Sequence, residues 1–269
     1  MRNRLAHLLL MAAPPVAFFL LLIAVWQLAT GLGHVPSFLL PSPLRVGQAA
    51  WQNCQDLLQA SGLTAAAALA GLAASLVVGM LVAIAFSQSA IVRRSFYPYA
   101  IFLQTVPSVA LAPLVIIWFG PGFASVVVVA FIIALFPIIT NATTGLLDLD
   151  QNLVELFAMS SASRRQLLFK LQLPNSIPYL IAGAKISCGL SVIGAIVGEF
   201  TAGYGENSYG LGYLIIATSG RLQLDYLLAA TLAAMLLGVL MFATVSLIGD
   251  WILRGWHAPG SVGDPNESG

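Results

Sequence analysis

The sequence predicts an all-α, polytopic membrane protein with about six transmembrane helices. Hydrophobic residues make up 59% of the 269 residues and charged residues only 8%, whereas a soluble domain carries about a quarter charged residues. Several apolar runs also approach the length that a helix needs to cross a bilayer, about 20 residues. A chain this apolar could not cover itself with polar surface in water, so we expect lipid to be its main solvent.

The first apolar run begins soon after Arg2 and Arg4 and resembles a signal peptide. The run has nearly full spanning length, however, and no clean small-x-small cleavage site follows it. We therefore interpret it as an uncleaved first helix. Further along, Gly and Pro residues at 119–122 mark a turn inside a long uncharged stretch. The predicted helices are 11–30, 63–88, 97–119, 123–143, 176–199 and 226–248, the last with Asp225 as its N-cap.

The distribution of Lys and Arg predicts the orientation of the chain. Placing the N-terminus in the cytoplasm leaves only Arg45 and Arg221 outside. The residues then on the cytoplasmic side are Arg2, Arg4, Arg93, Arg94, Arg164, Arg165, Lys170 and Arg254. Cytoplasmic loops are enriched in these residues, so we expect both termini to be cytoplasmic. Residues 1–10 are then a cytoplasmic N-terminus, 11–256 the transmembrane domain and 257–269 a disordered tail.

Two segments between the predicted helices are long. The outer segment, 31–60, holds a Pro-rich stretch and then an amphipathic one, which we expect to lie along the outer interface. The cytoplasmic loop, 144–175, is the most polar part of the chain, with two short helices predicted at 151–159 and 163–171. Large apolar residues such as Phe157 and Met159 in this loop indicate either a docking surface or a loop that folds back onto its own membrane base.

The cytoplasmic loop resembles the EAA signature of bacterial ABC importer permeases. That family pattern is Glu-Ala-Ala, three residues, Gly, and a downstream Ile-x-Leu-Pro; here Glu155 precedes Ser161 by six residues, and Leu171-x-Leu173-Pro174 follows. Other stretches similar to the nitrate/sulfonate/taurine branch are 106–108 through 118–120, 162–166, 173–179 and Gly210-Leu-Gly-Tyr-Leu-Ile215. The resemblance covers about residues 10–255 and implies a MetI-like ABC importer permease fold in the bacterial inner membrane.

The loop departs from the family pattern at three positions. Leu156 and Phe157 replace the two alanines, and Ser161 replaces the glycine. Glycine permits a turn between the two short helices, and serine can also form a turn, so we expect the loop to keep its shape. The replacements bear on which ATPase fits the loop rather than on membership of the broad family.

The resemblance implies partners that bring both energy and solute. Two permease copies, expected to be a homodimer, would form the pathway, and each would insert its loop into an ATPase subunit. A periplasmic or lipid-anchored binding protein would deliver a small anionic or polar solute, such as nitrate, a sulfonate, taurine or a pyrimidine. The residues implied at the ATPase interface are Glu155, Leu156, Phe157, Ser161, Ala162 and Ser163.

The chain is predicted not to be an enzyme. It has no G-x-x-x-x-G-K-[ST] loop to cradle phosphates, so ATP and Mg would be bound by the partner ATPase, and no cofactor or metal is expected in this chain. No catalytic constellation of Ser with His or of paired Asp residues is found either, which argues against an intramembrane enzyme. The basic residues are scattered, so nucleic acid is not an expected partner.

Lys185 and Glu199 are ionisable residues within the predicted fifth helix. A charge at membrane depth normally faces a cavity or a partner, so Lys185 is a candidate for lining or gating the pathway. It could instead reach the interface or pair with a carboxylate for stability. Glu199, at the outer end of the helix, is a second candidate for the pathway or its gating and a candidate contact for the binding protein. The two residues lie about 21 Å apart along a helix and are too distant to pair with each other.

An alternative function is a secondary transporter or another small-solute channel without an ATPase. Secondary transporters usually show inverted repeats and broken helices at the midplane. The sequence shows no repeat, and about six helices is short for that design. Small residues at Gly71, Ser75 and Gly79 recur every four positions, which favours close helix packing. Cys54 and Cys188 show no metal or disulfide spacing and are expected to be apolar packing residues.

Overall fold

The computed structural model describes residues 2–32, 40–202 and 209–254, and these residues form helices joined by short turns. The long helices are α1 (Arg2–Leu32), α3 (Cys54–Gln88), α6 (Phe123–Leu147), α9 (Leu173–Ala202) and α11 (Leu224–Arg254). The shorter ones are α2 (Pro43–Gln52), α4 (Ala90–Thr105), α5 (Ser108–Phe119), α7 (Gln151–Met159), α8 (Arg164–Leu167) and α10 (Leu211–Gly220), with a π-helical turn, η1 (Leu168–Gln172), between α8 and α9.

Four helical stretches of the described residues are long and apolar enough to cross a membrane. They are α3, α6, the continuous run 164–202 and α11. The other two predicted crossings consist of shorter apolar stretches, Ala17–Gly31 of α1 and Ser108–Phe119. The all-α membrane fold is therefore confirmed, and the fourth, fifth and sixth predicted spans correspond to α6, α9 and α11.

The predicted third crossing is not one helix. We expected it at 97–119, but α4 ends at Thr105 and α5 begins at Ser108, after Pro107 in an extended conformation (φ −58°, ψ 120°). Proline lacks an N–H donor, and it also disfavours the helical conformation in the residue before it. The long uncharged run is therefore two helices separated at Pro107, although it looks like one helix in the sequence.

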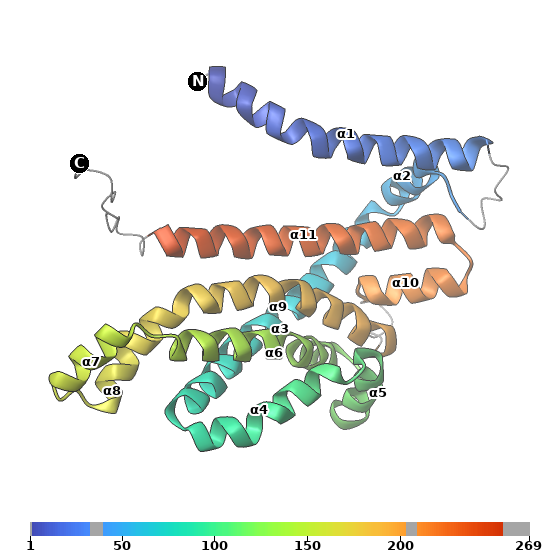
Figure 1. Ribbon diagram of the computed structural model, residues 1–269. Coiled ribbons are helices and arrows are strands. Elements are labelled where there is room, and N and C mark those ends of the chain that lie inside the picture. The colour runs from blue at the N-terminus through green and yellow to red at the C-terminus, as the bar shows by residue number, and fades with distance from the viewer. Residues whose placement is uncertain (1, 33–39, 203–208, 255–269) are drawn as a thin grey trace.

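The core is built around α6, which lies between α3 and α9 (Figure 1). Ala130 on α6 is fully buried. A Cβ added at Gly71 of α3 would lie 2.7 Å from the Ala130 Cβ, and one at Gly194 of α9 would lie 2.7 Å from the Ala130 Cα. Only glycine permits helices to approach this closely. Ser75 donates to the Phe131 carbonyl at 2.9 Å, which confirms that the small-residue stripe of α3 serves packing.

Several predicted boundaries are wrong. The second crossing begins at Cys54 rather than at residue 63, because the helix continues through the polar residues that precede its apolar part. The amphipathic stretch we placed along the interface is therefore split between α2 and the start of α3. Asp225 lies in the first turn of α11, one residue after its start, rather than at the N-cap. Cys188 is buried as expected, whereas Cys54 is exposed.

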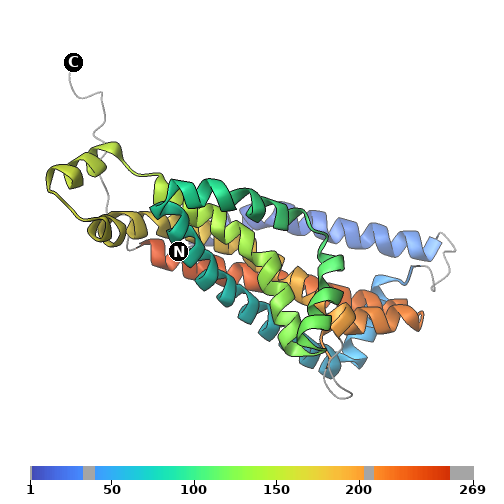
Figure 2. The ribbon, with the colours of Figure 1, turned by 90° about the horizontal axis from the view of Figure 1, so that it is seen from below.

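The two ends of the molecule carry different short helices (Figure 1). The start of α1, the last turn of α11 and the α7–α8 segment lie toward one end, which we name the loop end. Helices α2 and α10 lie at the other, the α10 end. Figure 2 shows the α7–α8 segment projecting beyond the long helices. The predicted tail at 257–269 and residue 1 lie outside the described residues.

Candidate functional site

Helix α7 is terminated by its own polar side chains. The Asp150 carboxylate accepts from the Asn152 N–H at 2.8 Å, which satisfies a backbone donor that an N-terminus leaves free. At the other end, the Ser160 hydroxyl donates to the Leu156 carbonyl at 2.8 Å. The predicted range 151–159 is confirmed, because these local signals suffice to define the helix.

The second loop helix starts as predicted but ends differently. Ser163 caps it through a capping box, in which the Gln166 N–H donates to the Ser163 hydroxyl at 3.3 Å and the Ser163 N–H donates to the Gln166 side chain at 2.7 Å. We expected a separate helix at 163–171, whereas α8 continues through η1 into α9. The π turn ends two residues before Pro174. Proline cannot donate to the carbonyl four residues earlier, that of Lys170, and would crowd it.

Ser161 forms the turn between α7 and α8. Its φ of 54° lies in the left-handed region, which glycine adopts most readily. The position is the one at which the family pattern expects glycine. The loop therefore keeps the shape that glycine would permit, with serine in a conformation that costs about 1–2 kcal/mol for an L-residue.

Most large apolar side chains of α7 are exposed, whereas Val154 and Phe157 are half-buried. Leu156 is 55% exposed and Met159 is 84% exposed, and α7 makes no extensive contact with another helix of the described residues. Leu168, on the π turn, instead packs against a cluster at the base that contains Ala142 and Leu146. The exposed residues of α7 favour the docking alternative, and Leu168 packs on the membrane base, but Phe169 of η1 is 66% exposed.

The predicted interface residues are brought together around a shallow hollow. It has a volume of ≈ 220 Å³ between α7 and the start of the second helix. Its lining residues are Leu156, Phe157, Ser160, Ala162, Gln166 and Lys170. Glu155, Ser161 and Ser163 are exposed in the same segment. The segment thus offers apolar groups with charges of both signs beside them, a composition suited to protein docking.

The base of the segment is tied to the long helices. Asn175 donates to the Gly145 carbonyl at 2.8 Å and to the Asp148 carbonyl at 2.7 Å, and the Tyr179 hydroxyl donates to the Asp148 carboxylate. These bonds join the end of α6 to the start of α9. The predicted loop 144–175 is accordingly shorter than expected, because both of its ends are helical.

Lys185 forms an ion pair with a carboxylate, as one of the alternatives above expected, but the partner was not identified from the sequence. Its ammonium lies 2.9 Å from the Asp250 carboxylate of α11, and the two side chains are 28% and 58% exposed. The pair joins α9 to α11 toward the loop end. Asp250 lies 65 residues away in sequence, so only the packing of the two helices could identify it as the partner.

Glu199 is fully buried and holds the start of α10. Its carboxyl group accepts from the Gly212 N–H at 2.8 Å and from the Thr64 hydroxyl at 2.9 Å. The Thr64 oxygen in turn accepts from the Leu211 N–H at 2.9 Å. Cβ atoms at Gly210 and Gly212 would overlap Glu199 or adjacent backbone. The buried Glu199 side chain is not available to an external protein in this structure, and the only sequence signal for its role was the Gly210-x-Gly212 spacing.

The comparisons with known proteins agree with this architecture. Residues 75–255 match the family described as binding-protein-dependent transport system inner membrane component. A formylaminopyrimidine transport permease of Halalkalibacterium halodurans is 33% identical over 247 residues, covering 91% of this chain and 96% of that protein. An Escherichia coli permease named for aliphatic sulfonates is 31% identical over 238 residues, covering 88% and 89%.

The fold also matches that of a solved transporter. An inward-facing structure of the MetNI methionine ABC transporter superposes with a TM-score of 0.61 at 19% identity, covering 74% of this chain and 95% of that one. The interruption at Pro107 is a feature that we associated with secondary transporters, but the family match includes it. The chain therefore belongs to the family of inner-membrane permease components of binding-protein-dependent ABC transport systems.

Proposed function

We propose that this chain is a non-catalytic permease subunit of an ATP-driven importer, in which the α7–α8 segment receives the movement of a partner ATPase. The observation that carries the proposal is the projecting α7, on which Leu153, Leu156 and Met159 are 42%, 55% and 84% exposed. An isolated nine-residue helix is marginal in water. A partner that covers α7 would bury its apolar groups and hold it in place.

The arrangement of the loop supports mechanical coupling. The Asn175 and Tyr179 hydrogen bonds connect the loop base to both α6 and α9, which pack closely along the core. ATP and Mg would be bound by the ATPase, and a binding protein would deliver a small solute from outside. Two copies of this chain, as a homodimer, would line the path. With the loop end in the cytoplasm, both termini would be cytoplasmic as well.

Glu155→Lys tests the coupling role. Glu155 is exposed on α7, so the substitution should leave folding and membrane insertion intact. We expect the variant to lose at least about tenfold of its affinity for the ATPase, as for a disrupted interface residue worth more than about 1.4 kcal/mol. The measurement is copurification of the ATPase with the tagged permease in mild detergent, together with solute-stimulated ATP hydrolysis.

The matched control is Arg45→Glu, a charge reversal on the exposed face of α2 at the α10 end. It should leave ATPase binding unchanged. Unaltered ATPase binding and transport by Glu155→Lys would refute the coupling assignment. If the wild-type chain brings down no ATPase at all, the alternative of a transporter without an ATPase gains support instead.

A further inference from the structure

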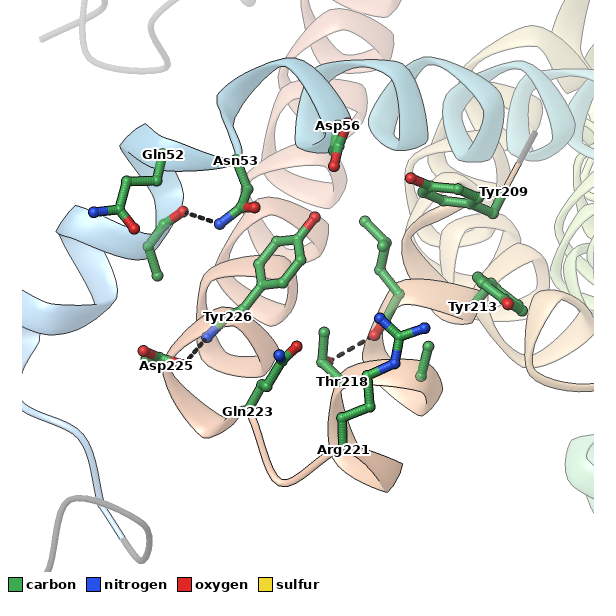
Figure 3. Close-up of a pocket in the computed structure, with 13 residues that line it drawn as sticks. Gln52, Asn53, Asp56, Tyr209, Tyr213, Thr218, Arg221, Gln223, Asp225 and Tyr226 are labelled. Atoms are coloured by element: carbon green, nitrogen blue, oxygen red, sulfur yellow. Dashed lines mark hydrogen bonds between the residues drawn. The ribbon is translucent and has the colours of Figure 1, made fainter. Parts of the chain in front are cut away.

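A polar cavity lies at the α10 end, opposite the candidate docking segment (Figure 3). Its volume is ≈ 660 Å³, and its walls come from the junction of α2 and α3, from α10 and from the start of α11. Most of its lining side chains are polar: Gln52, Asn53, Asp56, Tyr209, Tyr213, Thr218, Arg221, Gln223, Asp225 and Tyr226. In a chain with only 8% charged residues, this concentration of polar groups is unusual.

Tyr226 places an unsatisfied hydroxyl in the wall of this cavity. The hydroxyl is buried and has no hydrogen-bond partner among the described residues. Figure 3 shows the ring extending between α3 and α10 with its oxygen directed toward the Asp56 side. A buried hydroxyl without a partner costs about 1–3 kcal/mol. A small rotation of the Tyr226 side chain that exposed its oxygen to an acceptor on a ligand would recover that cost.

Charged groups in the cavity are not engaged with each other. Asp56 and Arg221 both line it, yet within the ranges that the structure describes neither forms an ion pair, in contrast to Lys185 and Asp250. The Asp225 carboxylate accepts from the neighbouring Tyr226 N–H at 2.9 Å. Two carboxylates against one guanidinium leave the cavity with an excess of negative charge, which disfavours a small anion.

The aromatic wall is preorganised. Tyr209 and Tyr213 stand with ring centroids 5.5 Å apart, and Tyr213 is carried by α10, whose first turn is fixed by the buried Glu199 and Thr64. Tyrosine faces attract cations and stack against flat rings. A wall held by buried hydrogen bonds requires little ordering when a ligand binds, which favours affinity.

We propose that this cavity binds the transported solute or a regulatory solute, and that its ligand carries a positively polarised nitrogen group together with a hydrogen-bond acceptor. The nitrogen group would lie against the tyrosine faces and Asp56, and the acceptor would face the Tyr226 hydroxyl and Arg221. An aminopyrimidine supplies both features through its amine and ring nitrogens, and a betaine supplies them through its ammonium and carboxylate. This proposal rests on the proposed function in one respect. If the loop end is cytoplasmic, the cavity at the α10 end lies on the outer side of the membrane.

The test is direct binding to the full-length chain, purified in detergent with its ATPase, by isothermal titration calorimetry. The probes are formylaminopyrimidine, glycine betaine, ethanesulfonate and nitrate; the last two are anions without an amine. We expect saturable binding of formylaminopyrimidine or of glycine betaine, which also distinguishes an amine from a quaternary ammonium. Asp56→Asn should weaken this binding about tenfold and Tyr226→Phe about threefold. Tyr99→Phe, at an exposed position on α4, is the matched control and should bind like the wild type.

Three results would overturn the assignment: binding of nitrate or ethanesulfonate alone, no saturable binding of any probe, or binding that neither substitution weakens. Tyr226→Phe removes a single oxygen, so it remains informative if Asp56→Asn fails to fold. The ATPase in the same preparation separates the two proposals. If it copurifies while no probe binds, the cavity assignment fails and the permease function stands; if it is absent while a probe binds, the reverse holds.

Discussion

Helices α7 and α10 have nearly the same length, nine and ten residues, but they are held in opposite ways. Helix α7 is fixed by hydrogen bonds within its own segment, from Asp150 and Ser160, and its apolar side chains are exposed. Helix α10 is fixed by residues far away in sequence, since Thr64 lies 147 residues from the Leu211 N–H that it accepts. Leu211 and Leu214 are buried in the core.

The comparison distinguishes a helix with exposed apolar residues from a helix whose apolar residues are buried in the core. A helix whose backbone is satisfied locally can project from the protein and still keep its shape, and it leaves its apolar face for another protein to cover. A helix whose first turn is satisfied by buried side chains is part of the tertiary structure. We therefore expect substitutions at α10 to alter stability, and those at α7 to alter partner binding.

The largest expected effect on stability comes from Glu199→Ala. It removes the acceptor of the buried Gly212 N–H and one acceptor of the Thr64 hydroxyl, and each unsatisfied buried group costs about 1–3 kcal/mol. We expect a loss of about 3 kcal/mol, measured by denaturant unfolding in detergent. Amide hydrogen exchange in 211–220 should rise, while exchange in 151–159 should not change. If the substitution left exchange in 211–220 unchanged, Glu199 would not anchor α10.

Ser161→Gly should have a smaller effect of opposite sign. Glycine relieves the cost of the left-handed conformation, about 1–2 kcal/mol, but its greater freedom in the unfolded chain offsets about 0.5–1 kcal/mol. We expect a net local stabilisation of about 0.5–1 kcal/mol, seen as slower amide exchange in 151–166. The control is Ser160→Gly, because Ser160 has a φ of −79° and glycine there should accelerate exchange. Acceleration by both would show that Ser161 carries no strain.

The smallest effect is expected at the Lys185–Asp250 pair. Partly exposed ion pairs contribute about 0.2–1 kcal/mol. A double-mutant cycle with Lys185→Met and Asp250→Asn should therefore give a coupling energy of about 0.5 kcal/mol. The same variants report on the proposed pathway role of Lys185. The informative result is one in which the two variants are equally stable while transport falls much more for Lys185→Met than for Asp250→Asn. In that case the lysine acts on the solute path and does more than link α9 to α11 through the ion pair.

The predictions made from the sequence succeeded where the controlling signal is local. The range of α7 and the cap at Ser163 depend on side chains within three residues of the backbone groups that they satisfy. The spans of α6 and α11 follow from apolar runs that continue for more than 20 residues. The break at Pro107 was missed because a search for uncharged length does not weigh a single proline, and the early start of α3 was missed because helices extend past the apolar region.

The sequence by itself determined that the chain is an all-α membrane protein and where α7 begins, because hydrophobic length and helix caps act over a few residues. Only the tertiary structure identified the contacts of Glu199 and Lys185. Their partners, Thr64 and Asp250, lie 135 and 65 residues away, and no periodicity in one segment encodes contact with another. The polar cavity at the α10 end also could not be predicted from the sequence, because its walls come from segments that meet only when α10 packs onto α3 and α11.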